Sequence, residues 1–232
     1  MKKHQDHPWL NLFINILIPI FILNKAGRFF SPTATLVLAL SFPLFYGAYE
    51  IVKFKKWNFF SLIGLVNISV TGSFGLLGLN GQWFAWKESF FPGFIGLAVI
   101  ASSFTRKPFI QTLFVNPQLI KMDVLFPKIE ELQKTEQLHQ LFQKSTRLLS
   151  LSFFISATAN YFMALSIFTP LSETLSELER QQVLNEQISK MTSTAMIALL
   201  IPSMLLLIGI FYHLLSGLEK ISGLKKEEFL QS

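Results

Sequence analysis

Six long stretches of this sequence contain almost no formally charged residue, and this feature restricts the fold more than any other. A helix rises about 1.5 Å per residue, so about 20 mostly apolar residues are needed to cross a hydrocarbon layer about 30 Å thick. The stretches that meet or approach this length are 8–24, 30–50, 58–79, 83–105, 148–170 and 191–215. We therefore predict an all-α fold, a polytopic bundle of about six transmembrane helices that forms a single membrane domain, 1–232.

The composition agrees with a lipid environment. Soluble globular chains contain roughly a quarter charged residues. This chain of 232 residues has 15% charged and 51% hydrophobic residues. Its net charge of +6 would suggest a nucleic-acid partner for a soluble protein, but in a membrane protein an excess of Lys and Arg reflects topology. We expect a lipid bilayer around the chain and no nucleic-acid partner.

The first stretch, 8–24, is the shortest, and polar residues and a proline dilute it: Asn11, Asn15 and Pro19. It is either a full first span or an interfacial helix on the membrane surface. Two lysines before an apolar run are typical of a signal peptide, but the residues that follow offer no small-x-small cleavage site. We expect this segment to be retained.

Prolines should shape several spans. Ser31 and Pro32 can supply an N-cap and a first-turn proline for the second span. Proline inside a helix removes a backbone hydrogen bond and favours a kink. We expect kinks at Pro19, Pro43, Pro92 and Pro202.

Lys and Arg are concentrated in alternate loops. Of the 20 such residues, 15 fall on one predicted side and four on the other, while Lys87 lies inside a span. Loops rich in Lys and Arg face the cytoplasm, whereas the loop 171–190 carries four glutamates. We predict that both termini are cytoplasmic and that 171–190 is an external loop.

The segment 106–147, between the fourth and fifth spans, has the composition of a soluble linker. Apolar residues recur there at roughly helical spacing among charges: Ile129, Leu132, Leu138, Leu141 and Phe142. We predict a cytoplasmic amphipathic helix that lies on the membrane or on the protein. The alternative is that 126–147 docks a protein partner.

Small and polar residues recur at helical spacing in three spans. Lipid provides no hydrophobic force between helices, so such residues mark packed faces. The third span has Gly64, Asn67, Thr71, Gly75 and Gly78, and the fifth has Ser152, Ser156 and Asn160. These stripes indicate either helix packing or a hydrated path between spans one, three and five. The candidate site residues taken from these stripes and from the first span are Asn15, Asn67, Thr71, Ser156 and Asn160.

Lys87 and Glu88 are the residues that cost most to place in a membrane, because an ionised side chain at that depth costs several kcal/mol. If the span begins at position 83, Glu88 lies about one turn inside the outer interface, where water and snorkelling reduce the cost. Glu88 is therefore either a functional group or an interfacial, solvated one. Both Lys87 and Glu88 join the candidate site residues.

Enzyme signatures are not found. The four histidines are scattered, and Cys is absent from the chain. No zincin, nucleophile-elbow or dinucleotide-binding pattern occurs. We expect no catalytic residues, no metal ligands and no cofactor, and we do not expect an enzyme.

Several short motifs point to a known family. They are Lys87-Glu88-Ser89, Pro92-Gly93, Gly96, Ser102-Ser103 and Arg106-Lys107-Pro108-Phe109, with Asn11, Asn15, Pro19 and Phe42-Pro43-Leu44 earlier in the chain. This half of the chain resembles a poorly characterised bacterial inner-membrane family related to intracellular septation protein A. The resemblance implies a six-span inner-membrane protein linked to cell-envelope maintenance or septation. Septation protein A is usually shorter, and the long linker is a departure from it.

Two functions from different classes remain open. The first is a small-solute or ion transporter or channel, whose path is lined by the polar stripes and Glu88. The second is a non-catalytic envelope or septation scaffold that docks a partner through 126–147. The sequence leaves a homo-oligomer open in both cases.

Overall fold

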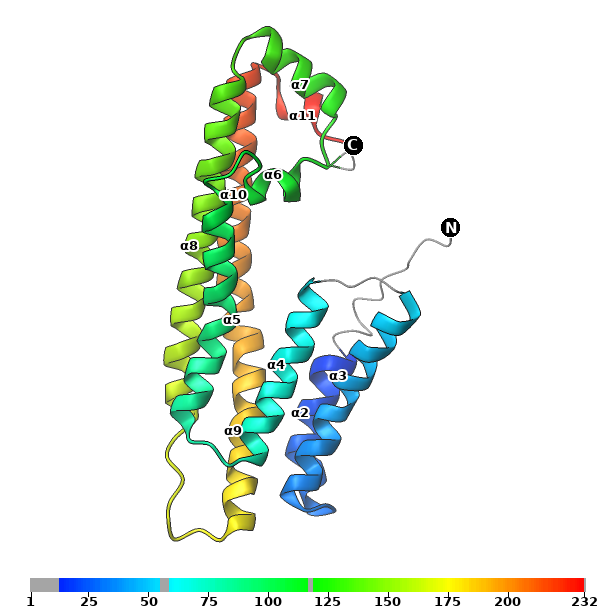
Figure 1. The fold of residues 1–232 in the computed structure, drawn as a ribbon, viewed down its shortest axis with the longest axis vertical. Coiled ribbons are helices and arrows are strands. Elements are labelled where there is room, and N and C mark those ends of the chain that lie inside the picture. Colours follow the sequence, from blue (N-terminus) through cyan, green and yellow to red (C-terminus); the bar gives the residue numbers. More distant parts are fainter. Residues whose placement is uncertain (1–12, 55–58, 117–118, 232) are drawn as a thin grey trace. The chain divides into compact units, whose positions relative to one another are not determined.

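The computed structural model describes residues 13–54, 59–116 and 119–231. Every named element among them is a helix, so the all-helical prediction is confirmed for these residues (Figure 1). The elements are a π-helix η1 (Phe13–Leu17), α2 (Ile18–Lys25), a 3-10 helix η2 (Ala26–Arg28), α3 (Pro32–Phe54), α4 (Phe59–Leu76), α5 (Gly81–Ser102), α6 (Phe109–Phe114), α7 (Met122–Glu131), α8 (Thr135–Ile167), α9 (Glu177–Ala198), α10 (Leu200–Ser222) and α11 (Lys226–Phe229).

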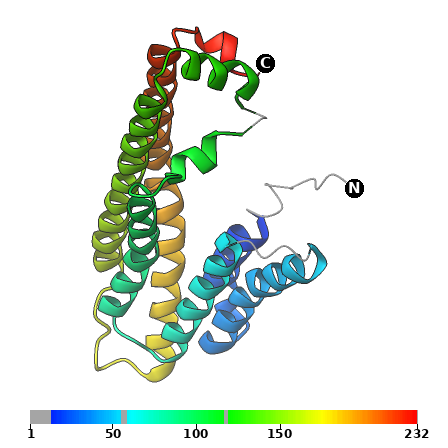
Figure 2. The same ribbon diagram turned by 45° about the horizontal axis from the view of Figure 1, so that its top comes forward.

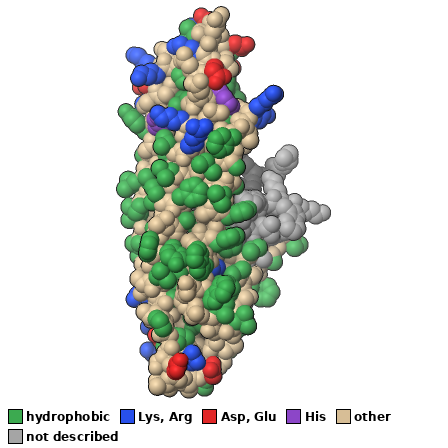
Figure 3. All heavy atoms as spheres, turned by 60° about the vertical axis from the view of Figure 1, so that its left-hand side comes forward, with side chains coloured by type: hydrophobic (Ala, Val, Ile, Leu, Met, Phe, Trp, Pro, Cys, Tyr) green, Lys and Arg blue, Asp and Glu red, His purple; other side chains and the backbone are tan. Residues whose placement is uncertain are grey.

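Four helical segments are long and apolar enough to cross a membrane. They are Pro32–Tyr49, Gly81–Ser102, Thr135–Ile167 and the nearly continuous Glu177–Ser222. Figure 3 shows exposed hydrophobic side chains on one face of the molecule, as expected for helices that contact lipid. The fold is thus compatible with an integral membrane protein.

The other two predicted spans remain predictions. Helix α2 has eight residues, which by themselves cannot cross a hydrocarbon layer about 30 Å thick. Residues 8–12 of that first span lie outside the described residues, as does residue 58 at the start of the third. Helix α4 has 18 residues.

Prolines act differently from helix to helix. The Ser31 side chain accepts a hydrogen bond from the Ala34 backbone N–H at 3.3 Å, as expected for the cap of α3. Pro43 and Pro92 lie inside α3 and α5, which continue through them. Pro202 has no N–H for the carbonyl of Ala198, the residue at which α9 ends. The predicted disturbance at Pro202 is therefore a break between α9 and α10.

Residue contacts divide the chain into two compact units. Unit 1 comprises Met1–Phe91 and Ala159–Leu199, and unit 2 comprises Pro92–Thr158 and Leu200–Ser232. Helices α5 and α8 each contribute residues to both units. The single membrane domain stays a prediction.

In unit 1, α3 contacts α2, α4 and α9, and α9 also contacts α2 and α4 (Figure 2). Glycines on α4 permit a close approach to α3. A Cβ at Gly72 would lie 2.7 Å from Leu40 Cδ1, and one at Gly75 would lie 2.6 Å from Leu36 Cδ2. At Gly75, the stripe of small residues therefore packs helices, and Gly72, which was not part of the predicted stripe, does the same.

In unit 2, the linker packs on the protein. Ile129, Leu138 and Phe142 are buried in a core that also contains residues of α10 and α11. The predicted amphipathic helix is interrupted after α7, where Gln133 has a φ of 53°, and α8 then runs on into the predicted fifth span. Leu132, beside the interruption, is 38% exposed. The cytoplasmic location of the linker stays a prediction.

The C-terminal segment closes over the linker. The Lys121 N–H donates to the Phe229 carbonyl at 2.8 Å, and the Gln231 N–H donates to the Leu119 carbonyl at 3.0 Å. Ile120 and Leu230 form an isolated antiparallel bridge. Phe229 is fully buried, so this segment belongs to the core of unit 2.

Candidate functional site

Lys87 is buried in unit 1, with 6% of its surface exposed. Its Nζ lies 2.6 Å from Glu88 Oε1 and donates a hydrogen bond to Thr71 Oγ1 at 2.7 Å. The Thr71 hydroxyl in turn donates to the Asn67 carbonyl at 2.9 Å. These contacts form a polar chain that joins α5 to α4, and we call it the Lys87 cluster.

The two charged side chains of the Lys87 cluster differ in exposure. The side chain of Lys87 is 4% exposed and that of Glu88 is 21% exposed. Burying an ammonium removes its hydration, so the charge must be compensated by a nearby anion and by hydrogen bonds. Glu88 supplies the anion and Thr71 the acceptor. A group that approaches from outside would therefore meet Glu88 first.

Two aromatic side chains of α5, the helix that carries Lys87, pack against rings of α8 and of the residue that follows it. Phe84 stacks on Phe168 with ring centroids 4.3 Å apart, and Trp86 lies 5.3 Å from Tyr161. Phe84 is fully buried, whereas Trp86 is 57% exposed.

Amide side chains of α9 donate hydrogen bonds to neighbouring segments of the chain. Gln181 Nε2 donates to the Gly75 carbonyl at 3.3 Å, and Asn185 Nδ2 donates to the Pro32 carbonyl at 2.8 Å. Gln187 Nε2 donates to the Thr169 carbonyl and hydroxyl at 3.2 and 3.1 Å. Sequence reasoning missed these residues because it treated 171–190 as a loop.

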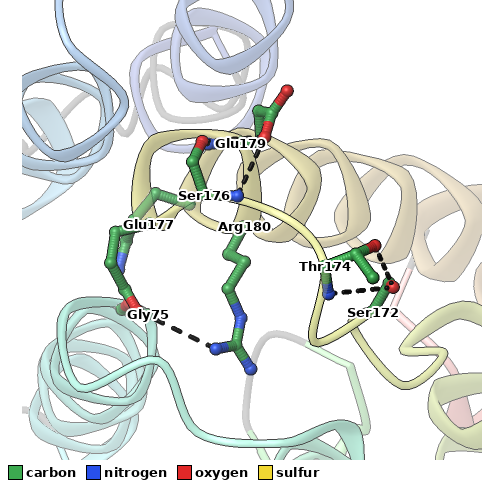
Figure 4. A network of polar contacts seen from close by, with 8 residues as sticks. Gly75, Ser172, Thr174, Ser176, Glu177, Glu179 and Arg180 are labelled. Carbon is green, nitrogen blue, oxygen red and sulfur yellow. Dashed lines mark hydrogen bonds and ion pairs between the residues drawn. The ribbon is translucent and has the colours of Figure 1, made fainter.

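A signal for this helix is present in the sequence. Ser176 and Glu179 have the S-x-x-E spacing of a capping box, and in the structure Ser176 Oγ accepts from the Glu179 N–H at 3.4 Å while the Ser176 N–H donates to Glu179 Oε2 at 2.9 Å (Figure 4). The second half of the predicted external loop is therefore helical.

Glu179 is exposed and lies in the polar first turn of α9, before the apolar part of the α9–α10 segment. Two hydrogen bonds lower the pKa of Glu179. The larger effect comes from the Ser176 hydroxyl and the smaller from the Ser176 backbone N–H, while desolvation acts weakly in the opposite direction. Both hydrogen bonds favour the ionised carboxylate.

The structure brings together only some of the candidate residues. Lys87, Glu88 and Thr71 are in contact, and Asn67 joins them through its carbonyl. Asn15 is partly buried in η1. Ser156 and Asn160 are partly buried on α8, where the boundary between the units falls between them. The path between spans one, three and five stays a prediction.

Within the described ranges, no group of three His, Cys, Asp or Glu side chains could hold a metal ion. The prediction that the chain is not an enzyme is a separate matter and stays untested. Comparisons with protein-family models, curated proteins and solved structures gave no match.

Proposed function

We propose that this protein is a transporter or channel for an ion or a small solute in a bacterial inner membrane, and that the Lys87 cluster lines its path. The observation that supports this is the burial of a lysine ammonium in a helix apolar enough to span a membrane. Ionisable residues at such positions are costly and usually mark substrate or ion pathways.

The cluster couples an arriving ion to a helix contact. A proton or a cation that binds the Glu88 carboxylate weakens its attraction for Lys87. The Lys87 ammonium then depends on the Thr71 hydroxyl of α4 and on any anion that enters with the solute. Occupancy of Glu88 would thus alter the contact between α4 and α5, which is a simple basis for gating.

Glu88→Gln tests this proposal in proteoliposomes, with proton, Na⁺ and K⁺ flux as readouts. We expect near-complete loss of the flux that the unchanged protein supports, because glutamine cannot take up a proton or bind a cation electrostatically. The same variant leaves Lys87 without its anion, so it should also lower stability.

A double variant separates the two effects. Lys87→Met with Glu88→Gln removes both charges, so stability should recover while flux stays absent. Ser73→Ala is the control, since its exposed hydroxyl bonds to the Ser69 carbonyl of its own helix, and it should keep full flux. Normal flux in Glu88→Gln, or no flux above empty liposomes in the unchanged protein, would refute the proposal.

A second candidate is an envelope scaffold that binds a partner through 126–147. It is favoured by the ordered core that the linker forms with α11, which is more structure than a connecting loop needs. Leu125 and Ile129 of α7 are buried there, so a partner would contact the outer face, which carries Val124 and the Lys128–Glu131 pair at 2.9 Å. Reversing both charges should release a co-purifying partner, and an unchanged set of co-purified proteins would count against the scaffold.

A further inference from the structure

Three helices of unit 1 meet near Gly75, which lies one helical turn after Thr71 of the Lys87 cluster on α4. Helices α3, α4 and α9 contact one another in pairs. A Cβ at Gly75 of α4 would lie against Leu36 of α3 and 3.4 Å from Ile188 Cδ1 of α9. Gly75 therefore lies at the point where the three helices converge.

Polar side chains of α3 and α9 lie at this convergence. Gln181 and Asn185 are one turn apart on α9, and their amide nitrogens donate to the carbonyls of Gly75 and Pro32. Thr35 follows Pro32 by one turn, on the same side of α3. These hydrogen bonds bring one backbone carbonyl of α4 and one of α3 next to the two amides.

The orientation of both amides is determined by these hydrogen bonds. A backbone carbonyl can only accept, so the nitrogen of each amide must face it and the oxygen must face elsewhere. Gln181 Oε1 and Asn185 Oδ1 are buried and have no hydrogen-bond partner in the part of the chain that the structure describes, and the same holds for Thr35 Oγ1. Thr35 is 1% exposed and Asn185 is 3% exposed.

Three buried oxygens without a partner among the described residues make this junction a candidate site for a polar ligand. A buried acceptor that loses its hydration without a new partner is destabilising, and native proteins rarely tolerate it. The occupant must therefore supply positive charge or donors to the oxygens.

The geometry points to a binding site for a small monovalent cation such as Na⁺, held by Thr35 Oγ1, Gln181 Oε1 and Asn185 Oδ1. The three oxygens are neutral, whereas Ca²⁺ and Mg²⁺ sites rely on carboxylates. Gly75 is the penultimate residue of α4, so the negative end of that helix dipole lies at the site, where it offsets the positive end of α3, which begins at Pro32. Interrupted helix ends and their carbonyls coordinate Na⁺ in other membrane proteins.

A bridging water molecule is the competing occupant, because it can donate to two acceptors. The two occupants differ in one measurable respect: a cation at this site makes stability depend both on which salt is present and on these three side chains, whereas a water does not. This site does not depend on the transport proposed above, since cation binding is measured in detergent without any flux.

The test is thermal unfolding of the purified full chain in detergent, with NaCl, KCl, LiCl or N-methyl-D-glucamine chloride at one ionic strength. We expect a higher, saturable Tm with one alkali cation, most plainly Na⁺, than with the organic cation. Thr35→Val removes one proposed ligand oxygen, because valine has nearly the same shape as threonine but no hydroxyl. It should raise the half-saturating cation concentration about tenfold, the usual effect of losing one contact to a charged group.

Two further variants keep the test decisive. Gln181→Met should raise the half-saturating concentration in the same direction, which guards against a folding defect in Thr35→Val. Thr192→Val is the matched control, because its hydroxyl bonds to the Ile188 carbonyl of its own helix at 2.9 Å, and it should behave as the unchanged protein does. An equal Tm in all four salts would assign the site to water and overturn the proposal, as would a cation effect that both site variants leave intact.

Discussion

Unit 1 buries an ammonium group and several amide side chains among its helices, whereas the interior of unit 2 is built from apolar side chains and a few hydroxyls. In unit 1 the polar groups make contacts between helices, as Lys87 does with Thr71 and Asn185 with Pro32. In unit 2 the linker packs through an apolar core that includes Phe229, together with backbone hydrogen bonds to the C-terminal segment.

The difference suggests that the two units have different roles. Buried polar groups stabilise a fold less well than apolar packing of similar volume, so their presence calls for a second reason. Unit 1 contains both sites proposed above, and unit 2 contains the ordered linker. We therefore expect substitutions in the two units to change stability by different amounts and for different physical reasons.

The largest expected effect is in unit 2. Phe229→Ala should destabilise the chain by about 3–5 kcal/mol, since it removes a fully buried ring from a core that faces water if the linker is cytoplasmic. Phe84→Ala in unit 1 also removes a buried ring that stacks on a neighbour, but in lipid its burial gains packing only, so the cost should be smaller.

Thermal unfolding of both variants in one detergent measures this contrast. Leu132→Ala serves as a control, because that side chain is 38% exposed beside the same core. Equal losses at Phe229 and Phe84 would mean that the two interiors are stabilised in the same way.

Glycine substitutions should give an intermediate effect. A Cβ at Gly81 in unit 1 would collide with the Phe168 carbonyl oxygen, which belongs to the backbone, whereas one at Gly217 in unit 2 would meet only the tip of Leu141. We expect Gly81→Ala to cost about 1–3 kcal/mol and Gly217→Ala to cost less, because a side chain can move.

Gly209→Ala is the control for helix propensity. Among the described residues, no atom outside the backbone of its own helix lies within 4 Å of a Cβ built there, so the variant should be neutral or gain up to about 1 kcal/mol. Thermal unfolding of all three variants ranks them, and a Gly81→Ala protein as stable as Gly209→Ala would contradict the close approach of α5 to Phe168.

The smallest expected effect concerns the capping box of α9. The pKa of Glu179 is lowered in the folded state, so its contribution to stability is complete above the pKa of the unfolded chain and is lost as the pH falls through the lower, folded pKa. Ser176→Ala should remove most of this acid dependence and slightly destabilise the protein.

The measurement is the difference in Tm between the unchanged protein and Ser176→Ala from neutral to acidic pH. That difference should shrink as the pH falls. A constant difference would show that the charge of Glu179 contributes nothing to the cap.

Much of the local structure could be predicted from the sequence. The positions of α3 and α5, the cap at Ser31 and the interruption near Pro202 follow from apolar length and from the missing N–H of proline, which are properties of neighbouring residues. The pairing of Ser176 with Glu179 was equally local and could have revealed α9. The selection of Lys87, Glu88 and Thr71 as candidates also followed from the high cost of charged and polar groups in an apolar span.

The sequence by itself determined that the chain is helical and that its long uncharged stretches suit a membrane, since helix propensity and transfer free energy depend on each short segment. It predicted six spans, and the described part of the structure has four helical segments that are long and apolar enough to cross. Only the tertiary structure decided that Lys87 bonds to Thr71, that the α9 amides bind α3 and α4, and that the C-terminal segment covers the linker. These contacts join residues far apart in the chain, and their geometry depends on how whole helices pack. The physical reason is that the free energy of burying a polar atom depends on whether it finds a hydrogen-bond partner, and the packing of the helices decides that.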